Sequence, residues 1–434
     1  MSGPSKHTGE GGRPIADFVI ENADLIATSK GPAPKRGPSQ HHFFRERESL
    51  IASCDGVIVF VGRRDDVSAA IDIAPTATRV DASGCTVIPG FVDPHTHAVF
   101  AGNRDHELRQ RLDGATYEEI AAAGGGINAT VTATRAASED ALVESARLRL
   151  DAMLASGTTT CEIKSGYGLT TDSELKLLRA IRRLDAVHAI DVVATFLGAH
   201  DVPPDLRGRR QEYISTIVNE MIPRVAAEEL ADWCDVFCDR GYFSVGESVA
   251  ILEAGARAGL RPRLHADELA SSGGCRVAAT VHARSADHLI HVDDQGIDEL
   301  SRAGVCAVLL PIAAFYLKLG FAPARSLIEH HVPVALASDI NPGGGLSPSM
   351  PFAIALACFD MHMTLEEALV AATINAAWSL DLSERIGSLE VGKQMDAVLI
   401  RGSLTELLRV GVPVVHRVIK RGVIVFTHLS NSGN

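Results

Sequence analysis

Two histidines separated by one residue are the first feature of this sequence that can do chemistry. His95 and His97 stand in the run DPHTH, directly after the apolar segment VIPGFV. Side chains at i and i+2 of an extended strand point to the same face, so both imidazoles can reach one metal ion. Neutral imidazole suits zinc or iron, and a catalytic site needs further protein ligands and one position left for water.

Two later segments supply further ligands. His265 ends the run RPRLH, and Asp339 ends the run VALASD. A His-x-His pair alone is a weak signal, but the same pair followed by a strand-end His and a strand-end Asp predicts a metal centre. No lysine ends the run WCDVFCD, where a modified lysine would be needed to bridge two metals, so we expect one ion per chain.

Two titratable residues lie near the predicted ligands in the sequence. Glu268 follows His265 by three residues, and His288 lies in the next apolar run, ADHLIH. Beside a metal, Glu268 can carry a proton to the substrate and His288 can activate the attacking water. Without a metal, Glu268 would be a solvated acid and His288 a core imidazole.

The elements that must position these residues alternate along the middle of the chain. From residue 91 to residue 380, eight short apolar runs are separated by helix-length amphipathic stretches. This pattern predicts a TIM (β/α)8 barrel, an α/β fold whose active sites lie at the C-terminal ends of the strands. The alternative is an open doubly wound sheet, although neither a Walker loop nor a dinucleotide fingerprint is present.

Both ends of the chain are rich in β-branched residues and turn residues, which predicts strands there. We expect residues 15–90 and 381–434 to form a small β-sandwich-like domain, with the barrel at 91–380 inserted between its halves. Residues 1–14 are expected to be a flexible leader. The Pro-rich and basic segment 30–48 shows neither helical nor strand periodicity and is interpreted as a loop insertion.

The composition restricts the partners. The chain has 434 residues, 46% of them hydrophobic and 22% charged, which fits a globular α/β enzyme. A net charge of -13 argues against nucleic acid and anionic membranes as partners, and an anionic substrate would need local Arg or His. The eight scattered cysteines indicate reduced thiols. With no membrane-length apolar run and a polar start, we expect a cytoplasmic protein.

The run PGFVDPHTH with the later strand-end His, His and Ser-Asp resembles the amidohydrolase superfamily. The runs PHTHAVFAGNRDHELRQRLDGATYEEI, EIKSGYGL, TFLGAHDVP, LHADE and DINPG resemble, more narrowly, the imidazolonepropionases of histidine degradation. This resemblance covers nearly the whole chain after residue 85. It implies hydrolysis of the cyclic amide of 4-imidazolone-5-propanoate to N-formimidoyl-L-glutamate, one zinc or iron ion per chain, and a homodimer.

The resemblance also implies roles for individual residues. The implied metal ligands are His95, His97, His265 and Asp339, and the implied catalytic residues are Glu268, His288 and Asp339. The implied substrate-binding residues are Arg104, Tyr167, His200, Glu268, Asn341, Gly343 and Gly344. A guanidinium can clamp the substrate carboxylate, although Arg104 would otherwise be a surface charge. Family members often carry a hydroxyl residue at the position of Gly344, so there a backbone N–H would have to serve.

Two other functions fit parts of the pattern. A deaminase that releases an amine from another nitrogen heterocycle needs the same His-x-His, His-x-x-Glu, His and Asp set. A noncatalytic relative that keeps the barrel as a binding module would have lost ligands, whereas every ligand position is filled here. Detection of ammonia among the products would distinguish the deaminase from the ring-opening hydrolase.

Overall fold

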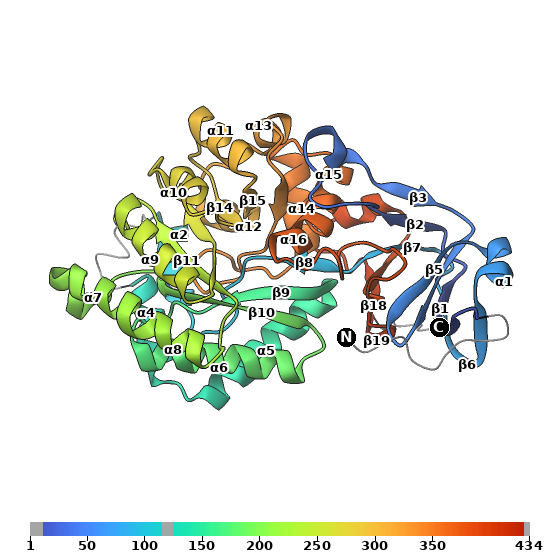
Figure 1. Cartoon of the computed structure of the whole chain (residues 1–434), viewed down its shortest axis with the longest axis horizontal. Helices are drawn as coiled ribbons and strands as arrows, with labels where there is room; N and C mark the ends of the chain where they lie inside the picture. Colours follow the sequence, from blue (N-terminus) through green and yellow to red (C-terminus); the bar gives the residue numbers. More distant parts are fainter. Residues whose placement is uncertain (1–11, 115–124, 429–434) are drawn as a thin grey trace.

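A computed structural model of the chain describes residues 12–114 and 125–428 and divides into a barrel surrounded by helices and a smaller part built from sheets (Figure 1). Eight parallel strands follow one another in chain order around the barrel. The predicted TIM barrel is therefore confirmed. Its strands are β8 (Phe91–Asp93), β9 (Thr158–Lys164), β10 (Asp191–Ala199), β11 (Trp233–Cys238), β13 (Leu264–Ala266), β14 (Ser285–His288), β15 (Cys306–Leu309) and β16 (Val334–Leu336), and the short β12 (Arg261–Pro262) also pairs with β11.

Helices cover the outside of the barrel, so the strands are buried on both faces. Their sequences are therefore nearly continuous apolar runs. All seven residues of β9 are buried, for example. The preceding helix begins after Ser138, whose side chain accepts a hydrogen bond from the backbone N–H of Ala141, and ends just before Gly157 at φ +98°. The helices of the barrel part are α2 (Asp105–Leu112), α4 (Ile127–Ala136), α5 (Glu139–Ala155), α6 (Thr171–Val187), α7 (Arg210–Thr216), α8 (Ile222–Ala227), α9 (Val245–Arg257), α10 (Gly274–Thr280), α11 (Asp294–Ala303), α12 (Pro311–Leu317), α13 (Ala324–Glu329), α14 (Met350–Phe359), α15 (Leu365–Ala371) and α16 (Ile374–Ser379).

Single backbone hydrogen bonds join the two ends of the strand path, β8 and β16. The N–H of Asp339 donates to the carbonyl of His95 at 3.1 Å, and the N–H of His97 donates to the carbonyl of Ile340 at 2.9 Å. Three of these four residues are predicted site residues. The backbone that closes the barrel therefore also fixes the spacing between ligands from its first and last strands.

Two sheets lie beside the barrel, and one combines strands from both ends of the chain (Figure 1). In the six-stranded sheet, β7 (Cys85–Pro89) pairs with β17 (Ala397–Arg401), so Val87 lies opposite Leu399. These two side chains share a buried core with Phe18 and Ile51 of the four-stranded sheet. The four-stranded sheet is β5 (Val57–Arg63), β4 (Ser49–Cys54), β1 (Ile15–Glu21) and β6 (Asp72–Asp81), and the six-stranded sheet is β19 (Val423–Thr427), β18 (Val415–Lys420), β17 (Ala397–Arg401), β7 (Cys85–Pro89), β2 (Leu25–Thr28) and β3 (Phe44–Glu46), with the one-turn helix α1 (Val67–Ala70) before β6. The domain boundaries at residues 90 and 381 stay a prediction.

The prediction that segment 30–48 is a loop without secondary structure is wrong. It contains a 3-10 helix over Gly37–His41 and the strand β3. The fully buried side chain of Gln40 donates to the carbonyl of Val334 at 3.2 Å and accepts from the N–H of Val334 at 3.3 Å. This amide satisfies backbone groups of β16, which a local periodicity search cannot detect because the partner lies almost three hundred residues away.

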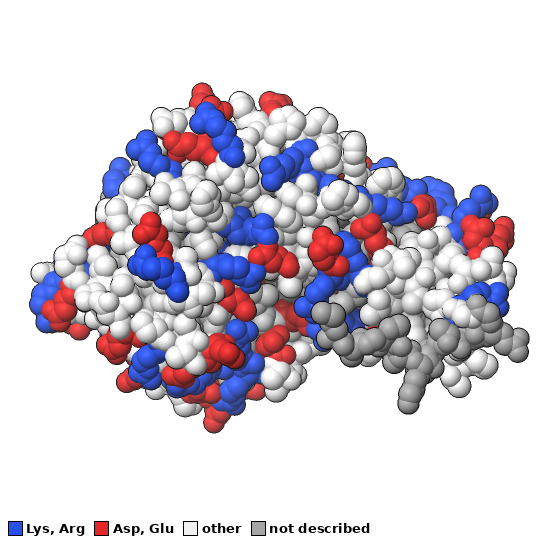
Figure 2. Space-filling model, in the orientation of Figure 1, with Lys and Arg blue, Asp and Glu red and all other residues white. Residues whose placement is uncertain are grey.

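The visible surface mixes positive and negative side chains rather than gathering one sign (Figure 2). Among the described residues, no helix is long and apolar enough to cross a membrane. Residues 1–11 of the predicted leader lie outside the described part of the chain.

Candidate active site

The four predicted metal ligands come together at the C-terminal ends of the barrel strands. Oδ1 of Asp339 lies 3.7 Å from Nε2 of His95 and 3.7 Å from Nε2 of His97. Nε2 of His97 lies 3.3 Å from Nε2 of His265. Two ligands on a tetrahedral zinc ion, with bonds of about 2.1 Å, lie about 3.4 Å apart. These three separations are close to the spacing of two ligands on a single ion, and the donor atoms of His95, His97 and Asp339 all lie within 4.8 Å of one another.

These donor atoms are buried, and several lack a hydrogen-bond partner. Nε2 of His95 and Oδ1 of Asp339 have none, and burial keeps the pKa of the His95 imidazole well below its usual value. Burial also raises the pKa of the Asp339 carboxyl to about 7, and a cation beside it would lower that pKa. Unsatisfied lone pairs that face one another in a buried site are stabilised by a cation, so the donor set fits a metal.

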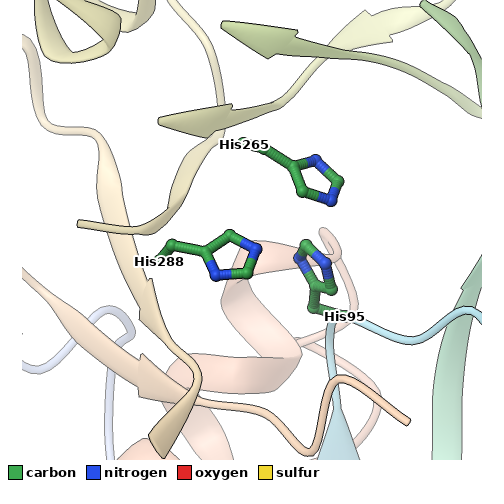
Figure 3. Close-up of side chains that lie close together, drawn as sticks. All are labelled: His95, His265 and His288. Atoms are coloured by element: carbon green, nitrogen blue, oxygen red, sulfur yellow. The ribbon is translucent and has the colours of Figure 1, made fainter. Parts of the chain in front are cut away.

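Carboxylates fix the orientation of two ligand rings. Nδ1 of His95 lies 2.6 Å from Oδ2 of Asp287, and Nδ1 of His265 lies 3.1 Å from Oδ1 of Asp235. A carboxylate accepts the Nδ1 proton, which leaves the Nε2 lone pair for a metal. Figure 3 shows the His95 and His265 rings turned toward each other, with His288 beside them.

A group of fully buried charged residues behind the histidines was not predicted from the sequence. We call it the buried ion cluster: Glu162, Lys164, Asp235, Arg263 and Asp287. Nζ of Lys164 lies 2.8 Å from Glu162, 2.7 Å from Asp235 and 3.6 Å from Asp287. Burial would raise the pKa of Asp235, but Lys164 and His265 hold it well below the usual carboxyl value. The sequence signal that could have revealed this cluster is the presence of charged residues within the mostly apolar runs that form barrel strands.

Glu268 and His288 lie beside the ligands, as predicted. Nδ1 of His288 is 3.6 Å from Oε1 of Glu268, and both residues line the cavity described below. Burial, followed by the charge of Asp339, raises the pKa of Glu268 to about 8, while burial lowers the pKa of His288 well below its usual value. A carboxyl group that holds its proton near neutral pH suits proton donation.

Arg104 is buried rather than a solvated surface charge. Its Nε donates to Oγ1 of Thr130 on α4 at 2.9 Å, and its Nη1 would lie 2.4 Å from a Cβ placed on Gly343. Nearby, Arg111 donates to the carbonyl of Gly343 at 2.8 Å. The absence of a side chain at Gly343 therefore makes room for the guanidinium of Arg104.

Tyr167 and His200 form an aromatic wall next to the ligands. The rings of His97 and His200 stack with centroids 5.1 Å apart, and Tyr167 lies 5.4 Å from His200. Nδ1 of His200 donates to the carbonyl of Gly166 at 3.0 Å, and burial lowers the pKa of His200 to about 3. His200 is thus neutral, with Nε2 left as an acceptor.

The segment Asn341 to Gly344 is tied together internally. Oδ1 of Asn341 accepts from the N–H groups of Gly343 and Gly344 at 2.8 Å and 2.6 Å. In this conformation Asn341 therefore accepts from the Gly344 N–H that is expected to serve the substrate. A direct substrate contact by these three residues stays a prediction.

One cavity of about 800 Å³ contains these groups. Its lining includes the ligand His97, the guanidinium of Arg104 and the carboxyl of Glu268. Aromatic and apolar groups, among them Phe237 and Tyr242, complete the wall. The cavity can therefore hold a small anionic molecule between the donor cluster and a buried arginine.

Comparison with known proteins identifies the family. The imidazolonepropionase of Symbiobacterium thermophilum is 46% identical over 95% of this chain and 98% of its own length. That of Shouchella clausii is 50% identical over 94% of this chain and 92% of its own length. The chain belongs to the imidazolonepropionase family.

Other comparisons give more distant likenesses of this imidazolonepropionase-family chain. The profile of the amidohydrolase family matches residues 247–425. Among solved structures, Escherichia coli guanine deaminase superposes with a TM-score of 0.70 at 15% identity, covering 95% of this chain and 99% of that protein. A zinc-bound adenosine deaminase from Xanthomonas campestris superposes with a TM-score of 0.66 at 18% identity, covering 95% of this chain and 93% of that protein. These two likenesses show the fold alone.

Proposed function

We propose that this chain hydrolyses the cyclic amide of 4-imidazolone-5-propanoate, giving N-formimidoyl-L-glutamate. The observation that carries the proposal is one cavity whose lining includes both the buried Arg104 and three of the proposed ligands, His97, His265 and Asp339. Identities of 46% and 50% to imidazolonepropionases over most of the chain support the same reaction.

Substrate recognition depends on charge and shape. The Arg104 guanidinium pairs with the propionate, and Thr130 holds it by accepting from Nε, which leaves the outer nitrogens for the carboxylate. Neutral His200 accepts a hydrogen bond from a ring N–H through Nε2, and Tyr167 packs against the ring. These contacts direct the ring carbonyl toward the four ligands.

Proton transfer is assigned to the two remaining residues. A divalent ion held by the four ligands would act as a Lewis acid and favour deprotonation of water. His288 accepts the proton of the attacking water, whose oxygen bonds to the ring carbonyl carbon. Glu268 donates its proton to the ring nitrogen as the carbon–nitrogen bond breaks, and the former carbonyl carbon becomes a carboxylic acid that releases its remaining proton to solvent as a carboxylate. Proton transfer from His288 to Glu268 across their 3.6 Å separation restores the starting state.

A spectrophotometric assay of imidazolone-propanoate loss, combined with metal analysis of the same sample, tests the function. We expect ring opening without ammonia and near-stoichiometric zinc or iron. Ammonia release from a related heterocycle, with no consumption of imidazolone-propanoate, would instead support a deaminase. A chain that binds no metal and opens no ring would support the noncatalytic module.

Three finer predictions from the sequence remain proposals. Three imidazoles and one carboxylate accept either zinc or iron, so the ion is proposed to be one of these two. A homodimer and a cytoplasmic location follow only from the family resemblance and the composition. Metal analysis, light scattering and cell fractionation test them separately.

A further inference from the structure

The buried ion cluster connects one lysine to two of the proposed metal ligands. Lys164 lies at the end of β9 and has no exposed surface. It is not one of the residues that line the cavity. Its Nζ lies 2.7 Å from Oδ2 of Asp235, whose other oxygen is 3.1 Å from Nδ1 of His265. The lysine therefore holds one oxygen of Asp235 while the other orients His265.

The second connection runs through Asp287. Its Oδ2 lies 2.6 Å from Nδ1 of His95, 3.6 Å from Nζ of Lys164 and 3.7 Å from Nη2 of Arg263. Arg263 also donates to the carbonyl of Pro94 at 2.8 Å, so it is held by the backbone beside His95. Asp235 and Asp287 come from different strands, β11 and β14, and Lys164 reaches both.

Burial makes this arrangement costly unless the charges stay together. Two buried carboxylates that each orient a histidine would repel one another, and a shared cation between them offsets that repulsion. Partners of ligand imidazoles typically change metal affinity 10–100-fold when they are lost. Lys164 is placed to control both such partners.

We propose that Lys164 is a positioning residue that sets the metal affinity of the site by holding Asp235 and Asp287 against the Nδ1 atoms of His265 and His95. The inference rests on the proposed ligand set. Removal of Lys164 would let both carboxylates turn away, so that both rings lose their fixed orientation toward the ion.

Lys420 offers a matched control. It is also a buried lysine between two aspartates, with Nζ 2.6 Å from Asp396 and 2.8 Å from Asp191. It belongs to β18, and Asp191 begins β10 at the end opposite to the site. Lys420→Met therefore removes the same kind of buried ion pair without touching the proposed ligands or the carboxylates that orient them.

The experiment measures Zn²⁺ affinity of metal-free protein by competition with a chromophoric chelator, for the wild type, Lys164→Met and Lys420→Met. Circular dichroism checks folding, and the visible spectrum of Co²⁺-loaded protein reports ligand geometry. We expect Lys164→Met to bind Zn²⁺ 10–100-fold more weakly and to shift the Co²⁺ bands, with kcat lowered and KM nearly unchanged. Lys420→Met is expected to match the wild type in affinity and spectrum.

Equal affinity and spectrum in Lys164→Met and the wild type would overturn the inference while leaving the proposed function intact. A wild type that binds no Zn²⁺ would instead overturn the ligand set itself. If Lys164→Met does not fold, Asp235→Ala decides, because it removes the acceptor oxygens that join Lys164 to His265 but keeps Lys164 and every proposed ligand. Unchanged Zn²⁺ affinity in Asp235→Ala would then overturn the role of Lys164.

Discussion

Nδ1 of His288 faces Oε1 of Glu268 across 3.6 Å, although His288 ends β14, Glu268 follows β13 and neither is a proposed metal ligand. His288 adopts φ +77°, a conformation that non-glycine residues rarely take. This rare backbone conformation and the position beside a buried carboxyl group support the proton transfer proposed for the two residues.

Glu268→Gln keeps the shape of the side chain but removes the acid. We expect kcat to fall about 10²–10⁴-fold while the metal stays bound. Metal analysis of the variant is the control, and loss of the ion would reassign Glu268 to metal binding. Combined with His288→Ala, the loss should be smaller than the product of the two single losses, because the residues act as a unit.

The pH dependence of kcat should reveal the raised pKa of Glu268. Burial raises it to about 8, and only the protonated form can donate, so kcat should fall as pH rises through this value. A bound cation would favour the charged form and move this fall to lower pH. The kcat of Glu268→Gln should not decrease in this pH range. If it decreases as in the wild type, the titrating group is a residue other than Glu268.

His97→Ala should remove both the ion and the activity. His97 lies 3.3 Å and 3.7 Å from two other proposed ligand atoms, so its loss leaves a three-ligand site with no replacement donor. Metal content and turnover are measured on the same preparation. Wild-type turnover in metal-free His97→Ala protein would refute the metal-dependent mechanism.

Arg104→Ala should weaken binding of the substrate and of its transition state by about 1.5–3 kcal/mol, the range for a hydrogen bond to a charged group. Arg104→Lys should recover only part, because an ammonium cannot form the paired contact. A substrate analogue without the carboxylate is the control. If Arg104→Ala weakens binding of that analogue as much as binding of the substrate, the role of Arg104 is structural.

Gly343→Ala should raise KM with the metal retained. The new Cβ would lie 2.4 Å from Nη1 of Arg104, so the guanidinium must move from its place beside Thr130. Gly246→Ala is the matched control, because a Cβ at Gly246 meets nothing within 4 Å. An unchanged KM in Gly343→Ala would show that Arg104 can bind the carboxylate from another position.

The sequence allowed the eight barrel strands to be predicted, and also the convergence of the four residues proposed as ligands, since each stands at or just after the end of an apolar run. The buried ion cluster was not predictable in the same way. Lys164 and Asp235 contact each other from different strands, and strand periodicity indicates which residues are buried without giving their partners. Gln40 was missed for a related reason, because its partner Val334 is remote in the sequence.

The seam between the first and last barrel strands forms only when nearly the whole barrel has left the ribosome. Asp93 and Ser338, which hydrogen bond across it, are 245 residues apart in the sequence. Because synthesis proceeds from the N-terminus, a growing chain that ends before Asp339 contains His95 and His97 but lacks the carboxylate ligand. The complete set of proposed metal ligands therefore exists only late in synthesis, and a chain terminated anywhere before this residue has neither a closed barrel nor all four of them.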